Sequence, residues 1–201
     1  MPLYFFGEEN NLSAQERVKS PSAQHSKFIY RDLEEELEFF LRMVPPVDAH
    51  LNVYSTKLWS LIVRASSEID SQLHSLVVEL DSSLKNKRTS FSVFQKYETQ
   101  LQLRSYGVNL SFNGRRLVPF DEKLRGGKPE WWIGYNEVKH RRLDTLESAS
   151  LDHALLAVAG LYIVLFRQFG DYLMPPPLTL IGVQMHQQSP SRVFGRVGPN
   201  A

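Results

Sequence analysis

The sequence predicts a mainly α protein, a helical bundle of about five helices with one inserted β-hairpin. Apolar residues recur at three- and four-residue steps along most of residues 27–169, which is the period of a helix. Between residues 107 and 119 the period changes to two, which is typical of strands. The longest apolar stretch, Ala154 to Phe166, is shorter than the ~20 residues needed to cross a bilayer, so it predicts a core helix and no membrane span.

The 201 residues suit one domain between two tails, and a hydrophobic content of 42% is enough for a core. Residues 1–26 are rich in Ser, Asn, Gln and Glu without a sustained period, and residues 175–201 are rich in Pro, Gln, Gly and Ser. Both segments are therefore expected to be tails. The helical domain is expected to span residues 27–174, with the hairpin at about residues 107–119.

The first predicted helix runs from Lys27 to Met43 and ends before Pro45-Pro46, because proline cannot continue a helix. Its acidic side chains, which are expected to face solvent, are Asp32, Glu34, Glu35 and Glu38. The second helix, from about Tyr54 to Leu84, is the longest and has an unbroken apolar seam. This seam consists of Leu58, Ile62, Ala65, Ile69, Leu73, Leu76 and Leu80.

A third helix is expected to begin after Thr89 or Ser90 as its N-terminal cap and to end near Tyr106-Gly107, where glycine permits a positive φ. The hairpin follows, because Asn113-Gly114 between alternating segments favours a type I′ turn, in which both central residues have positive φ. Such a hairpin usually covers one end of a bundle, whereas an exposed strand edge can also recruit a protein partner. The sequence alone leaves both roles open.

The next predicted helix begins at Pro129, since proline is tolerated in a first helical turn, and continues to about residue 146. Its apolar arc contains Trp131, Trp132, Tyr135, Val138, Leu143 and Leu146. The last helix, Leu151 to about Phe169, is apolar nearly all round and is expected at the centre of the bundle.

Two cations, Lys139 and Arg142, fall inside the apolar arc of the helix that begins at Pro129. A buried cation without a partner costs several kcal/mol or loses its charge. The carboxylates of Glu68 or Asp70 on the long helix are therefore the expected partners.

Asn136 and His140 lie one helical turn apart on the flank of the same arc, where they can share a groove. Histidine moves protons near neutral pH, and an amide can orient a ribose hydroxyl or a phosphate oxygen. The neighbouring Lys139, Arg141 and Arg142 can stabilise a pentacovalent phosphate. This set suits metal-independent RNA cleavage, in which a ribose 2′-hydroxyl attacks its own phosphate. In the structural alternative, His140 binds a neighbouring helix and the aromatic residues fill the core.

The charge of the chain is nearly balanced but unevenly distributed. With 23 Lys and Arg against 22 Asp and Glu, the net charge of +1 argues against a bulk nucleic-acid binder. From Arg115 to Arg142, however, eight basic residues stand against four acidic ones. This local excess can face phosphates, although a solvated loop has the same composition.

The absence of cysteine excludes a disulfide scaffold, a thiolate metal site and a cysteine nucleophile. The six histidines are scattered, without a pair at ligand spacing, so no metal and no cofactor is expected. Gly126-Gly127-Lys128 lacks the spacing of a phosphate loop and is expected to be a flexible loop. Because the first residues do not form a secretory signal, the expected location is cytoplasmic.

Three features together resemble the HEPN superfamily of small helical bundles. They are the long helix with Arg64-Ala65 and Glu68-Ile69-Asp70, a later helix with Asn136 and His140 four residues apart, and a closing apolar helix. The HEPN motif is an Arg, often followed by a polar residue such as Asn, then three further residues and His. In this chain Tyr135 occupies the place of the Arg. The pattern from Trp131 to His140 also resembles uncharacterised bacterial HEPN-like proteins.

The resemblance implies RNA binding and metal-independent endoribonuclease activity, as in defence or toxin–antitoxin systems. It also implies a homodimer, because HEPN sites are usually assembled from two copies of the motif. His140 would be the acid or base and Asn136 would orient the ribose, with Lys139, Arg141 or Arg142 binding phosphate. Tyr135 in the place of Arg keeps an alternative open: a catalytically silent HEPN relative or a non-enzymatic helical interaction module.

Overall fold

A computed structural model describes residues 18–87, 89–121, 124–141, 144–170 and 181–187, and structural statements below refer to these. They form six α-helices: α2 (Pro21–Met43), α3 (Thr56–Leu80), α4 (Phe91–Lys96), α5 (Glu98–Leu101), α6 (Glu130–His140) and α7 (Leu151–Phe169). Their strands are β1 (Tyr106–Leu110), β2 (Arg116–Leu117), β3 (Leu124–Arg125), β4 (Lys128–Pro129) and β5 (Ile181–Gln187). The predicted mainly α fold with an inserted hairpin is confirmed.

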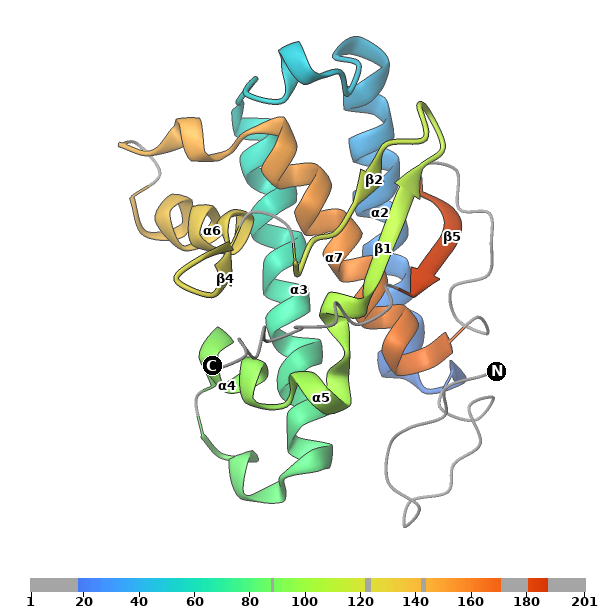
Figure 1. Ribbon diagram of the computed structural model, residues 1–201, viewed down its shortest axis with the longest axis vertical. Helices are drawn as coiled ribbons and strands as arrows, with labels where there is room; N and C mark the ends of the chain where they lie inside the picture. Colours follow the sequence, from blue (N-terminus) through green and yellow to red (C-terminus); the bar gives the residue numbers. More distant parts are fainter. Residues whose placement is uncertain (1–17, 88, 122–123, 142–143, 171–180, 188–201) are drawn as a thin grey trace, which may run out of the picture.

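Helix α7 lies at the centre of the molecule, where it packs against α3, α2, α6 and β1 (Figure 1). All residues from Ala154 to Leu165 are buried. By length and composition alone α7 could cross a membrane, but 72% of its apolar window is buried inside the protein. The prediction of a central core helix is confirmed.

The long helix α3 is also confirmed, and a side-chain cap fixes its start, because Ser55 Oγ accepts a hydrogen bond from Leu58 N at 3.1 Å. Helix α2 instead begins at Pro21 and not at the predicted Lys27. Ser20 Oγ accepts from Ala23 N at 3.2 Å, and Pro21 occupies the first turn, where a backbone N–H has no partner to lose. The polar composition of this segment concealed a capped helix start.

The expectation that the acidic residues of α2 only face solvent is wrong. Glu34 is buried and accepts a hydrogen bond from Tyr30 Oη at 3.3 Å. Asp32 and Glu36 both bind the guanidinium of Arg64 on α3. Asp32 and Glu36 therefore join α2 to α3.

The Glu36 carboxylate is expected to make stability depend on pH. Burial raises its pKa, but hydrogen bonds from Lys57 and Arg64 lower it, so that the folded pKa lies below the ordinary value. Its stabilising contribution is therefore present above the ordinary carboxylate pKa and is lost as the pH falls below about 4.5 through the folded value. Glu36→Gln should reduce the free energy of unfolding at pH 7 and should make that free energy fall less in acid. Urea denaturation at pH 7 and at a pH below about 4.5 measures both effects. Equal pH dependence of this variant, the wild type and the exposed control Glu35→Gln would contradict this account.

The predicted hairpin is formed by β1 and β2, which pair antiparallel with Val108 opposite Leu117. Its connection is longer than a two-residue turn, because Gly114 N donates to Leu110 O and Leu110 N donates to Arg115 O, both at 2.8 Å. Gly114 has a φ of 69°, whereas Asn113 is not among the described residues with positive φ. The hairpin is confirmed, but the type I′ turn at Asn113-Gly114 is wrong.

The other edge of β1 pairs antiparallel with β5, so that β1 is the middle strand of a three-stranded sheet in the order β2-β1-β5 (Figure 1). Residues 181–187 lie in the segment expected to be a tail. Their alternation of Ile181, Val183 and Met185 with Gly182, Gln184 and His186 has the period of a strand, which the composition of the surrounding segment concealed. The remainder of the predicted tail lies outside the described residues.

A second, unpredicted hairpin is formed by β3 and β4. The two residues that connect them, Gly126 and Gly127, have φ values of 59° and 78°. Positive φ at both central positions is the requirement of a type I′ turn, and glycine meets it without steric cost. The loop expected here is therefore a tight turn, which leads directly into α6.

The predicted third helix is interrupted. It is replaced by α4, α5 and a 3₁₀ turn (Leu103–Ser105), and the chain changes direction at Gln102, whose φ is 53°. The buried Arg167 of α7 holds this corner, since its Nε donates to Leu101 O at 2.9 Å. Gly107 does not end a helix but lies in β1, where an added Cβ would be 2.9 Å from Val118 Cγ1. Close packing in the sheet explains this glycine.

Candidate functional site

Helix α6 ends at His140, so the predicted continuation to about residue 146 is wrong. The carbonyl oxygen of Arg141 accepts hydrogen bonds from Asp144 N at 3.0 Å and from Thr145 Oγ1 at 2.9 Å, which turns the chain back. Leu146, expected on the apolar arc of the helix, lies in a 3₁₀ turn (Leu146–Ser148). Helix α6 therefore ends directly after the residues proposed to carry the chemistry.

The three aromatic residues of α6 are buried. Trp131 is fully buried, and its Nε1 donates to Pro119 O at 2.6 Å. The ring centroid of Trp132 lies 5.0 Å from that of Phe91 and 5.4 Å from that of Tyr135. These side chains fill the core beneath α6 and fix the orientation of the helix.

Tyr135, which occupies the place of the motif Arg, is 2% exposed and faces α3. Its Oη lies 3.4 Å from Ser67 Oγ and accepts a hydrogen bond from Lys139 Nζ at 2.9 Å. The Lys139 ammonium also lies 5.1 Å from the centre of the Tyr135 ring. A cation thus stands beside Tyr135, supplied by the residue one helical turn later.

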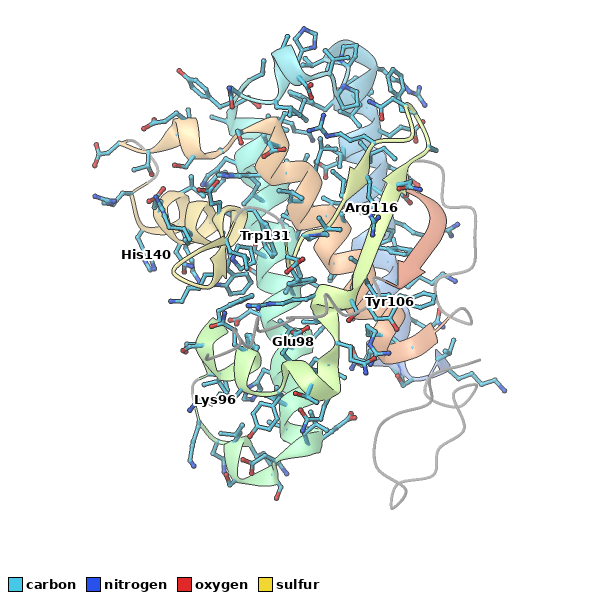
Figure 2. The ribbon with its side chains drawn as sticks, viewed as in Figure 1. Lys96, Glu98, Tyr106, Arg116, Trp131 and His140 are labelled. Atoms are coloured by element: carbon cyan, nitrogen blue, oxygen red, sulfur yellow. The ribbon has the colours of Figure 1, made fainter. Side chains whose placement is uncertain are left out.

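Asn136 and His140, the predicted catalytic residues, are both exposed. Asn136 Nδ2 donates to Trp132 O of its own helix at 2.8 Å, which fixes the orientation of the carboxamide. His140 is the last residue of α6 and lies at the outer end of the helix (Figure 2). The side chains are accessible and lie on the same helix, with no hydrogen bond between them.

Of the predicted phosphate-binding cations, Lys139 and Arg141 are exposed, and Arg142 lies outside the described residues. Glu137, two residues before Lys139, accepts from Ser148 Oγ at 2.9 Å and lies 3.6 Å from Arg125. Its charge is therefore directed to another cation. The last turn of α6 and the residue after it present the consecutive basic side chains Lys139, His140 and Arg141.

Glu68 is not the partner of Lys139. Its Oε1 accepts hydrogen bonds from Ser26 Oγ at 2.9 Å and from Gln72 Nε2 at 2.7 Å, so it joins α3 to α2. Lys139 needs no buried carboxylate, because it is exposed. Glu68 therefore belongs to the structural part of the predicted set.

An open hollow of about 340 Å³ on α3 was not predicted. It is lined by Ser67, Asp70, Ser71, His74, Lys87 and Thr89. The imidazole Nδ1 of His74 lies 3.1 Å from Thr89 Oγ1, and Ser67 connects the hollow to Tyr135. The helical spacing of the polar α3 residues was the signal that could have indicated this face.

Among the described residues, no group of three or more His, Cys, Asp or Glu side chains is arranged to hold a metal ion. Comparisons with protein-family models, with curated proteins and with solved structures gave no match. The class of protein is therefore defined by fold and site alone. It is a mainly α protein with an exposed basic end on α6 beside a polar hollow on α3.

Proposed function

We propose that the protein is a HEPN-like, RNA-binding protein that holds the ribose-phosphate backbone at the end of α6. The observation that carries this proposal is the exposure of Lys139, His140 and Arg141 in sequence, while Glu137 is paired with Arg125. Two cations close together at a helix end, here Lys139 and Arg141, attract phosphates without reading the bases. The buried Val138 packs this end of α6 against the core, and Trp59 Nε1 of α3 donates a hydrogen bond to Val138 O at 3.1 Å.

We further propose that the bound RNA is cleaved without a metal ion. The ribose 2′-oxygen forms a bond to the adjacent phosphorus, and the bond from phosphorus to the 5′-oxygen breaks. One imidazole accepts the 2′-hydroxyl proton, and a protonated imidazole donates a proton to the leaving 5′-oxygen. His140 is the candidate for these steps, and a homodimer would supply a second copy. Because the Asn136 amide nitrogen is engaged, its carboxamide oxygen is the group that would orient the ribose.

A second candidate function is a catalytically silent HEPN relative or a helical interaction module. One observation favours it: Tyr135, in place of the motif Arg, is buried and bound to Ser67 and Lys139. It therefore cannot deliver the charge that an Arg would bring. Lys139 places an ammonium beside the same hydroxyl, which is why RNA binding is proposed first.

RNA binding is tested by the salt dependence of affinity for a labelled single-stranded RNA, measured by fluorescence anisotropy. For single strands, each phosphate contact contributes about 0.7 to the slope of log K against log salt concentration. Replacing Lys139 and Arg141 together by Gln should weaken binding and reduce this slope by roughly 1.4. The charge-matched control replaces the exposed Lys19 and Arg31 of the α2 region by Gln. No binding by the wild type, or the same slope in both double variants, would refute the proposal.

A further inference from the structure

The hollow on α3 is connected to the end of α6 by a chain of polar groups. Lys139 Nζ donates to Tyr135 Oη at 2.9 Å, and Tyr135 Oη lies 3.4 Å from Ser67 Oγ at the edge of the hollow. From Ser67 the open hollow extends along α3 to His74 and is also lined by Lys87 and Thr89. These contacts place Ser67, at the edge of the hollow, and Lys139 on either side of the same Tyr135 hydroxyl.

The lining of the hollow defines the chemistry of its ligand. All six lining residues are polar, and the imidazole of His74 is the one aromatic ring, since no Phe, Tyr or Trp is among them. Three hydroxyls, an imidazole and the exposed ammonium of Lys87 can donate hydrogen bonds, and the one lining carboxylate, Asp70, has an interaction of its own. Bases bind single-strand sites by stacking on aromatic rings, whereas phosphates bind cations and hydroxyls. The lining thus fits a phosphate ester better than a base.

The His74 imidazole is held in one orientation. Its Nδ1 lies 3.1 Å from Thr89 Oγ1, so the position of the ring is fixed from the opposite wall of the hollow. A fixed donor that need not be ordered on binding costs less conformational entropy than a free one. His74, Thr89 and Lys87 therefore form the part of the hollow best suited to a phosphate.

We propose that this hollow binds a phosphate ester group, and that in the RNA complex this group is a backbone phosphate next to the one held at the end of α6. The inference rests on the proposed RNA binding for its source of phosphate, but not for its chemistry. A volume of about 340 Å³ leaves room for a phosphate with its ribose. The hollow is a positioning site, which fixes the direction of the strand across α6 and α3.

The test uses Lys87→Gln and Thr89→Val in the full chain, with Lys19→Gln as the charge-matched control and circular dichroism as the check of folding. Binding of labelled oligouridylate is followed by anisotropy over a range of salt concentrations. Lys87→Gln should weaken binding and reduce the salt slope by about 0.7, the contribution of one phosphate. Thr89→Val should weaken binding without changing the slope, because a neutral hydroxyl releases no counterion. Lys19→Gln should change neither quantity.

A second arm replaces RNA by uridine 3′-monophosphate and follows the His74 imidazole proton by NMR, assigned with His74→Gln. A saturable shift that Lys87→Gln abolishes supports the phosphate site and shows that a mononucleotide is sufficient. A reduced salt slope with RNA but no shift with the mononucleotide supports a site specific to the RNA backbone. If RNA binding is lost when Lys139 and Arg141 are replaced but is unchanged in Lys87→Gln, the phosphate site in the hollow is refuted and the proposed function stands. If the wild type binds no RNA, the proposed function fails, and the mononucleotide experiment alone shows whether the hollow binds a phosphate ester.

Discussion

Trp131→Ala is expected to lower the free energy of unfolding by about 3–5 kcal/mol, the usual cost of removing a buried tryptophan. The indole is fully buried and meets the Phe120 ring edge-on, with 5.9 Å between the ring centroids. It also packs over Gly160 of α7, where an added Cβ would stand 3.4 Å from Trp131 Cζ2. Alanine would leave a cavity between α6 and α7 and remove the donor to Pro119 O.

Urea denaturation followed by circular dichroism measures this loss. Trp131→Phe separates the loss of apolar volume from the loss of the hydrogen bond. It keeps much of the apolar volume but leaves Pro119 O without its donor, at a cost of about 1–3 kcal/mol. Phe112→Ala is the control, since Phe112 is 59% exposed and should change stability by less than about 0.5 kcal/mol. A loss below about 1 kcal/mol in Trp131→Ala would show that α6 is not anchored as described.

The central elements were predictable because their sequence patterns are continuous. Helix α3 keeps an apolar residue at every turn of one face, and α7 is apolar nearly all round, so no other arrangement buries them as well. The hairpin was predictable from its change of period. The prediction of its turn was wrong, because Asn113-Gly114 and Gly126-Gly127 are both residue pairs that tolerate positive φ, and only the strands beside them decide which pair forms a two-residue turn.

The errors lie where local composition conflicts with tertiary contacts. The strand β5 is supported by pairing with β1, more than 70 residues earlier, which a window of sequence does not contain. The interruption at Gln102 is held by Arg167, a contact between residues far apart in the chain. The early start of α2 was a local signal, Ser20 before Pro21, hidden among polar residues.

In the candidate site, too, some features could be predicted from the sequence and others depend on tertiary contacts. The exposure of Asn136 and His140 follows from the helical period, whereas Lys139, expected inside the apolar arc, is exposed as well. The partners of Lys139 and Glu68 could not be read, because each depends on which helix packs against which face. The hollow combines α3 with residues 87 and 89 and exists only in the folded chain.

His140→Ala is expected to reduce RNA cleavage by about 10²–10⁴, the usual contribution of a general acid or base. The expected loss lies in the rate and not in affinity, because the cations Lys139 and Arg141 remain. Cleavage of mixed RNA in the presence of a chelator gives the rate, and anisotropy gives the affinity. Replacing His25, an exposed histidine of α2, by alanine should leave both unchanged.

Asn136→Ala completes the cleavage test, because its carboxamide would orient the ribose without moving a proton. Its loss should therefore lower the rate less than the loss of His140 and should leave the pH profile of the reaction unchanged, whereas His140→Ala should flatten that profile. Wild-type protein that binds RNA but does not cleave it would identify a silent relative, with Tyr135 in place of Arg as the structural reason. Equal cleavage by wild type, His140→Ala and Asn136→Ala would remove the nuclease proposal, since no reaction at the end of α6 could then account for the product.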